Sequence, residues 1–122
     1  SQGMSKRILI IDDEHLVLDT MDWILTEMGY SVVTCPEPDA GEREAVTRDF
    51  DLVLVDIRMP RTNGAELTES ILHARPESRI LVITGYPSDP LVQRALDAGA
   101  RGVVKKPFEI AKVLEYLPDP TL

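Results

Sequence analysis

The sequence is poor in the features that mark secreted, membrane-embedded and nucleic-acid-binding proteins. Its single cysteine, Cys35, excludes an internal disulfide and suits a reducing compartment. No apolar stretch approaches the roughly 20 residues of a membrane span, and no signal-peptide pattern is present. Lysine and arginine number 13 against 21 acidic residues, a net charge of −8, whereas nucleic acids and anionic membranes attract a cationic surface. These absences predict a cytoplasmic protein that binds neither nucleic acid nor membrane directly.

What is present is the composition of an ordered globular domain. The chain has 122 residues, of which 43% are hydrophobic and 28% charged, which argues against disorder. This length fits one domain with a sizeable core. Ser1-Gln2-Gly3 before Met4 is expected to be a remnant of expression, so residues 4–122 are predicted to form the single domain.

Apolar runs and helical patterns alternate five times along the chain. The predicted strands are 8–12, 30–35, 51–56, 79–84 and 102–104. Helical patterns follow them at about 17–28, 39–48, 64–75, 88–98 and 108–117. Because a parallel crossover needs a helix and is right-handed, this alternation predicts an α/β fold: a parallel sheet with helices on both faces, in three layers.

Reactive side chains stand where the predicted strands end. In a parallel sheet, ligands bind beyond the carboxyl ends of the strands, at the topological switch point. The residues at these ends are Asp12 and Asp13, Asp56, Thr84, and Lys105 and Lys106, while the second strand ends in Cys35-Pro36 and offers nothing reactive. The chemistry of the protein is therefore expected among these side chains.

The residue types favour a hard cation and a phosphoryl group. Three carboxylates repel one another unless a cation or protons intervene. Cys35 and His15 are the only sulfur or imidazole ligands nearby, which argues against zinc, whereas oxygen ligands suit Mg²⁺. A lysine and a threonine hydroxyl supply the charge and the hydrogen bond that phosphoryl oxygens need. Asp56 ends a fully apolar strand and is the best candidate nucleophile, since an aspartate can form an acyl phosphate.

Taken together, these motifs resemble the receiver domain of two-component response regulators. The matching features are Asp12-Asp13 after the first strand, Asp56 with MPRTNG shortly beyond it, Thr84-Gly85 after the fourth strand and Lys106-Pro107 after the fifth. The resemblance covers about residues 6 to 117. It implies a five-stranded flavodoxin-like sheet of strand order 2-1-3-4-5.

The resemblance also implies a role for each residue of the site. Asp56 would accept a phosphoryl group from the phosphohistidine of a kinase. Mg²⁺ would be held by Asp13, Asp56 and the backbone carbonyl of Arg58, with Asp12 acting mostly through water.

Three further residues would complete the switch that the resemblance implies. Lys106 would contact the phosphoryl oxygens, its bond to Pro107 would be cis, and Thr84 would reach the phosphoryl group and trigger the conformational shift. The protein would catalyse only its own phosphorylation and dephosphorylation. Its partners would be a sensor histidine kinase or phosphotransfer protein and an output domain or downstream protein. A homodimer through the fourth helix, fifth strand and fifth helix is common in the family.

The sequence departs from the family pattern in places. Val103 stands where the family usually has Tyr or Phe. Arg58 and Tyr86 occupy variable positions that tune dephosphorylation in the family, so the phosphoryl lifetime does not transfer from relatives. The chain ends in LPDPTL, and no output domain is expected beyond it.

Other interpretations make distinct demands on the same residues. A haloacid-dehalogenase-type phosphatase needs a DxD motif after the first strand, and a flavodoxin needs a hydroxyl- and glycine-rich phosphate loop; the DDE at 12–14 supplies neither. Asp12 and Asp13 can cap the first helix and still bind metal. Leu16 lies off the inward stripe of that helix, and we expect it to be partly buried rather than a kinase contact. A phosphorylation-independent interaction module on the same fold stays open.

Overall fold

The apolar runs form a five-stranded parallel sheet. The computed structural model describes residues 6–106 and 110–117. The sheet strands are β1 (Arg7–Ile11), β2 (Ser31–Cys35), β3 (Leu52–Asp56), β6 (Ile80–Thr84) and β7 (Gly102–Lys105). They are all parallel, in the spatial order β2-β1-β3-β6-β7. With the five strands counted in chain order this is 2-1-3-4-5, so the predicted α/β fold and strand order are confirmed.

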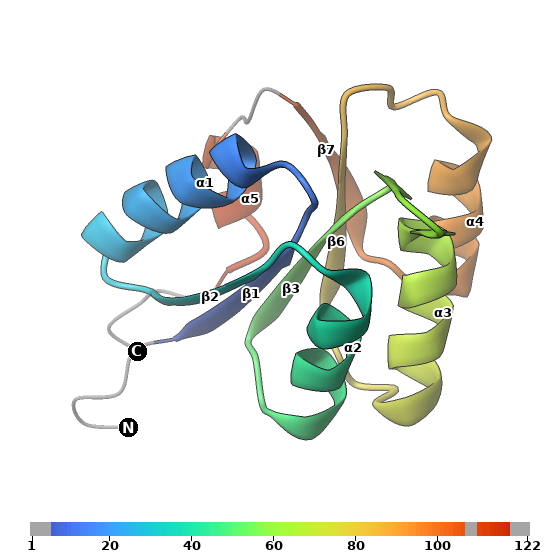
Figure 1. Ribbon diagram of the computed structural model, residues 1–122, viewed down its shortest axis with the longest axis horizontal. Helices are drawn as coiled ribbons and strands as arrows, with labels where there is room; N and C mark the ends of the chain where they lie inside the picture. The colour runs from blue at the N-terminus through green and yellow to red at the C-terminus, as the bar shows by residue number, and fades with distance from the viewer. Residues whose placement is uncertain (1–5, 107–109, 118–122) are drawn as a thin grey trace.

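Helices cover both faces of the sheet (Figure 1). They are α1 (His15–Glu27), α2 (Pro38–Thr47), α3 (Gly64–Ala74), α4 (Pro90–Ala98) and α5 (Ile110–Leu114). Figure 1 shows α1 and α5 on one side of the sheet and α2, α3 and α4 on the other. The predicted last helix, 108–117, is too long at its C-terminal end, because 115–117 lie beyond α5; residues 108 and 109 lie outside the described residues.

Two apolar cores lie against the two faces. Successive residues of a strand point to opposite faces, so Leu9, Val53 and Val82 pack with α2, α3 and α4, and Ile8, Leu54 and Leu81 pack with α1 and α5. The central strands are buried on both faces, which explains why they read as continuous apolar runs.

A small antiparallel hairpin follows β3 and was absent from the predicted elements. It pairs β4 (Arg58–Met59) with β5 (Thr62–Asn63) around a Pro60-Arg61 turn. Arg61 has φ +66°, a backbone conformation that non-glycine residues seldom adopt. Strands of two residues carry no measurable periodicity, so only the turn was visible in the sequence.

Two surface observations complete the fold. Leu16 is 79% exposed, so the expected partial burial is wrong: this position of α1 faces solvent rather than the sheet. Among the helices of residues 6–106 and 110–117, none combines the length and the apolarity needed to cross a membrane.

Candidate functional site

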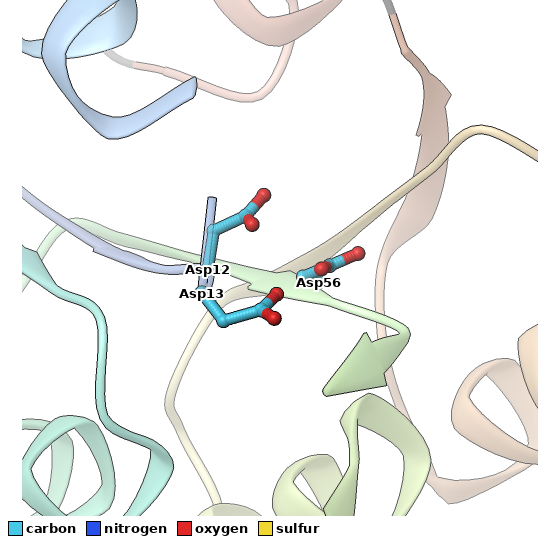
Figure 2. A group of neighbouring side chains, drawn as sticks. All are labelled: Asp12, Asp13 and Asp56. Carbon is cyan, nitrogen blue, oxygen red and sulfur yellow. The ribbon is translucent and has the colours of Figure 1, made fainter. Parts of the chain in front are cut away.

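Three carboxylates meet at the carboxyl edge of the sheet. Ile11 at the end of β1 pairs with Val55 of β3. Asp12, the residue just after β1, therefore lies beside Asp56, the last residue of β3. Asp12, Asp13 and Asp56 each place one carboxylate oxygen within 4.8 Å of those of the other two. Figure 2 shows the three side chains projecting from the ends of the two strands into the same space. The predicted convergence of these residues is confirmed by their positions.

Asp12 is the most deeply buried of the three. Its side chain has no exposed surface, and its Oδ1 accepts a hydrogen bond from the Glu14 N–H at 2.9 Å, just ahead of α1. Its Oδ2 lies 2.8 Å from the Lys106 ammonium, the distance of a charge-assisted hydrogen bond. Asp12 therefore binds the backbone just ahead of α1 with one oxygen and Lys106 with the other.

Lys106 neutralises part of this negative charge. Its Nζ lies 2.8 Å from Asp12 Oδ2, 2.8 Å from Glu14 Oε1 and 3.3 Å from Asp56 Oδ1. Burial by itself would lower the pKa of Lys106, but its acidic partners outweigh burial and raise it, so the ammonium stays charged. Glu14 was missed by the sequence reasoning: the helix start at Glu14 and the strand end at Lys106 are 92 residues apart.

The environment of Asp56 favours its protonated form. Its side chain is buried, and burial followed by the charge of Asp12 raises its pKa from 3.8 to about 7, against the opposing effect of Lys106. One lysine does not balance three carboxylates. The close spacing of the three carboxylates and their all-oxygen donor set fit a hard divalent cation such as Mg²⁺.

Thr84 borders the cluster from the next strand. Asp56 pairs with Ile83 in the register of β3 and β6, and Thr84 follows as a buried residue at the end of β6. Its hydroxyl accepts a hydrogen bond from the Tyr86 N–H at 3.0 Å, and its carbonyl accepts one from the Lys106 N–H at 2.7 Å. The backbone of Thr84 is thus tied directly to the lysine of the site.

Gly64 is a site residue that the sequence presented only as turn chemistry. A Cβ at this position would lie 2.4 Å from the carbonyl oxygen of Asp56, and the Gly64 N–H donates to the Ile57 carbonyl at 2.8 Å. Only a residue without a side chain lets α3 begin this close to β3. No local sequence signal separates this demand from an ordinary Asn-Gly turn.

The remaining predicted residues lie around this centre. Arg58 begins β4 two residues after Asp56, and its side chain leaves the site to pair with Asp89. Val103 is half-buried on β7 opposite Val82 and packs on the side of α2, α3 and α4. Pro107, with its expected cis bond, lies outside the described residues.

Fold and site together define a parallel α/β domain with a cluster of three carboxylates and a lysine at the carboxyl edge of its sheet. The family model for the response regulator receiver domain matches residues 8–118. The chain therefore belongs to the response regulator receiver domain family, which confirms the resemblance. Receiver domains are the signalling modules that interact with histidine kinases or phosphotransfer proteins and with output domains.

Individual relatives agree in sequence and in structure. The chemotaxis protein CheY of Thermotoga maritima is 34% identical over 122 residues, covering 93% of this chain and 96% of that protein. A CheY-like receiver domain protein from Methanospirillum hungatei superposes with a TM-score of 0.85 at 35% identity, over 92% of this chain and 90% of the other. A response regulator from Burkholderia pseudomallei, solved with a phosphorylated aspartic acid and a calcium ion, gives 0.84 at 29% identity, over 93% of this chain and 66% of that one.

The chain spans about half the length of the transcriptional regulators that it matches. It covers 54% of ComA of Bacillus subtilis, to which it is 33% identical over 116 residues and 92% of this chain. The rest of those longer proteins lies outside the compared region.

Proposed function

We propose that Asp56 is the phosphoacceptor of this receiver domain. The observation that carries the proposal is the buried Asp56 carboxylate, 3.3 Å from the Lys106 ammonium and surrounded by the other two acids of the cluster. The donor is the phosphohistidine of a sensor histidine kinase or of a phosphotransfer protein. The aspartyl phosphate in the Burkholderia pseudomallei relative supports this assignment.

The reaction transfers a phosphoryl group between two side chains. A carboxylate oxygen of ionised Asp56 attacks phosphorus, the bond from phosphorus to the histidine nitrogen breaks, and the product is an acyl phosphate on Asp56 with a neutral imidazole after proton uptake. Lys106 offers its ammonium to the phosphoryl oxygens as a charge-assisted donor. It is already within 3.3 Å of Asp56, so little movement is needed.

A divalent metal would complete the electrostatics of the site. Asp13, Asp56 and the backbone carbonyl of Arg58 would hold Mg²⁺, with Asp12 acting mostly through water. The bound ion would supply positive charge to the phosphoryl oxygens and favour the ionised form of Asp56. The close spacing of the three carboxylates supports this donor set.

The phosphorylated site acts on a partner through Thr84 and Lys106. Both residues lie at the carboxyl edge of the sheet, and their backbones are hydrogen-bonded to each other. The partner is an output domain or a separate downstream protein, with a homodimer through α4, β7 and α5 as one route. Residues 4–122 act as one domain, a proposal that the family match over 8–118 supports. The chain catalyses only its own phosphorylation and dephosphorylation.

Incubation with acetyl phosphate and Mg²⁺, read by intact mass, tests the proposal. We expect the mass gain of one phosphoryl group, abolished in Asp56→Asn and in excess chelator. Asp13→Asn should also abolish it, because one of the proposed metal ligands is lost. Undiminished incorporation in Asp56→Asn would overturn the assignment, and a chain that takes no phosphate would leave the phosphorylation-independent interaction module.

A further inference from the structure

We propose that Arg58 is a positioning residue that, through Asp89, holds the loop after Thr84 and the start of α4 in the arrangement described here. Releasing this ion pair would make the phosphorylated arrangement easier to reach. The proposal rests on the proposed function and deepens it, since it names the contact that opposes the switch.

Two hydrogen bonds join the side chain of Arg58, in β4, to Asp89, the residue just before α4. Arg58 Nε lies 2.6 Å from Asp89 Oδ2, and the second guanidinium nitrogen lies 2.9 Å from Oδ1. Such parallel hydrogen bonds fix direction as well as distance. The Arg58 side chain is 66% exposed, but the Asp89 carboxylate is only 8% exposed, so this end of the pair is held by its surroundings.

Asp89 is also the residue that starts α4. Its Oδ1 accepts from the Leu91 N–H at 3.0 Å and its carbonyl accepts from the Val92 N–H at 2.9 Å. A side-chain acceptor at the N-cap satisfies backbone groups that a helix leaves open. One carboxylate therefore binds both the first turn of α4 and the side chain of Arg58.

A series of hydrogen bonds links the same residue to Thr84. The Asp89 N–H donates to the Tyr86 carbonyl at 3.0 Å, and the Tyr86 N–H donates to the Thr84 hydroxyl at 3.0 Å. Residues 84–91 thus behave as one hydrogen-bonded unit. At one end of the unit is the hydroxyl of Thr84, which is proposed to bind the phosphoryl group. At the other end Asp89 is hydrogen-bonded to the side chain of Arg58.

These contacts connect Thr84, the proposed phosphoryl-binding residue, with Arg58, a proposed metal ligand. Arg58 would offer its carbonyl to the metal, and its backbone is anchored by pairing with Asn63 in the β4–β5 hairpin. If the Thr84 hydroxyl turns toward Asp56, it leaves the Tyr86 N–H, and the loop that carries Asp89 shifts relative to the anchored Arg58. A bond made in only one of two arrangements favours that arrangement. The Arg58–Asp89 pair therefore opposes the shift.

Beryllofluoride, an acyl-phosphate mimic, measures this bias in the whole chain. We expect Arg58→Gln and Asp89→Asn, titrated with beryllofluoride in excess Mg²⁺ by calorimetry, to bind it each roughly two- to fivefold more tightly than wild type, the range set by a partly exposed ion pair. Asparagine keeps a good N-cap, so α4 should still form. The double variant should bind no more tightly than the tighter single variant, because both changes remove one contact.

The signs of the two changes separate this mechanism from plain electrostatics. Removing a positive charge near an anion site weakens anion binding, and removing a negative charge strengthens it, so electrostatics alone predicts opposite effects. Release of the ion pair predicts tighter binding in both variants. Arg58→Lys should lie between wild type and Arg58→Gln, because lysine supplies the charge without the two-pronged geometry.

A matched control and a second readout complete the test. Glu44→Gln removes the same kind of charge from an ion pair at the end of α2, where the Glu44 carboxylate lies 2.6 Å from Arg48, and should leave beryllofluoride affinity unchanged. Without ligand, backbone amide shifts of residues 84–91 in Arg58→Gln should move toward their bound-state values. Unchanged affinity in both Arg58 and Asp89 variants, or opposite effects, would overturn the positioning role alone. Failure of the wild type to bind beryllofluoride would overturn the proposed function with it.

Discussion

At the scale of single residues, the site is governed by an imbalance of charge. Three carboxylates lie close together beside one ammonium group, that of Lys106. The pKa of Asp56 rises to about 7 because of burial and the charge of Asp12. The nucleophile of the proposed reaction is thus half-protonated near neutral pH until another cation enters.

This imbalance predicts how stability depends on pH without metal. The unfolded Asp56 loses its proton near 3.8 and the folded one near 7, so between these values the folded state binds more protons. The free energy of unfolding should therefore fall as pH rises through this window, by at most about 1.4 kcal/mol per pH unit, and level off above it. Denaturant titrations in chelator at several pH values between about 4 and 8 measure the slope.

Two comparisons isolate Asp56 as the cause of the slope. Asp56→Asn has no proton to lose and should flatten this part of the profile, and excess Mg²⁺ should raise wild-type stability most at the upper end of the window. A wild-type profile in chelator that rises across the window, or a slope that persists in Asp56→Asn, would contradict the assignment.

At the scale of elements, the site depends on how closely α3 approaches β3. The first residue of α3 is Gly64, and the absent side chain leaves room for the carbonyl oxygen of Asp56. Asn63 caps the same helix through the Glu66 N–H at 2.9 Å. The turn and the helix start thus fix the position of the Asp56 backbone.

Gly64→Ala should damage both stability and phosphorylation. The added methyl group meets backbone atoms of Asp56 and Ile57 at 2.4–3.0 Å, and a clash with backbone is relieved only by moving β3 or α3. We expect a loss of roughly 1–3 kcal/mol in the free energy of unfolding and a slower uptake of phosphate from acetyl phosphate. Gly85→Ala is the matched control for stability, since its Cβ would meet nothing within 4 Å. Equal stability of the two variants would show that the close approach is not needed.

At the scale of the whole molecule, the question is how far a change at Asp56 spreads. Val103, at the position where the family usually has an aromatic ring, is half-buried on β7 and packs with the core under α2, α3 and α4. A β-branched side chain is stiff at χ1 and too small to swing as a ring does. The hydrogen-bonded unit from Thr84 to α4 is a route that leaves the site on this side.

We therefore expect a switch localised to residues 84–98. Amide shifts on adding beryllofluoride and Mg²⁺ should be large there and small at Val103. Thr84→Ala should blunt the response, because it removes the hydroxyl, whereas Val103→Ala should leave beryllofluoride affinity close to wild type even if it lowers stability. Large shifts at Val103 beside a quiet 84–98 segment would contradict this prediction.

The sheet and the residues at its carboxyl edge can be predicted from the local pattern of apolar and polar residues. The strands β1, β3 and β6 are covered on both faces, so burial leaves continuous apolar runs, and their alternation with helices permits few topologies. The polar residues that end these runs fall at one edge of any parallel sheet. For this reason the sequence predicts Asp12, Asp13, Asp56 and Lys106 together at this edge.

The contacts that distinguish this site arise only from the folded chain. Glu14 meets Lys106 across 92 residues and Arg58 meets Asp89 across 31, and Gly64 is demanded by a carbonyl on another element. Such pairs leave no periodic trace, because each depends on where two separately formed elements are placed by packing. Local pattern therefore predicts the fold and the chemical types gathered at the sheet edge. Which side chain binds which follows from the packing of the elements, because distance and burial are properties of packed elements and not of neighbours along the chain.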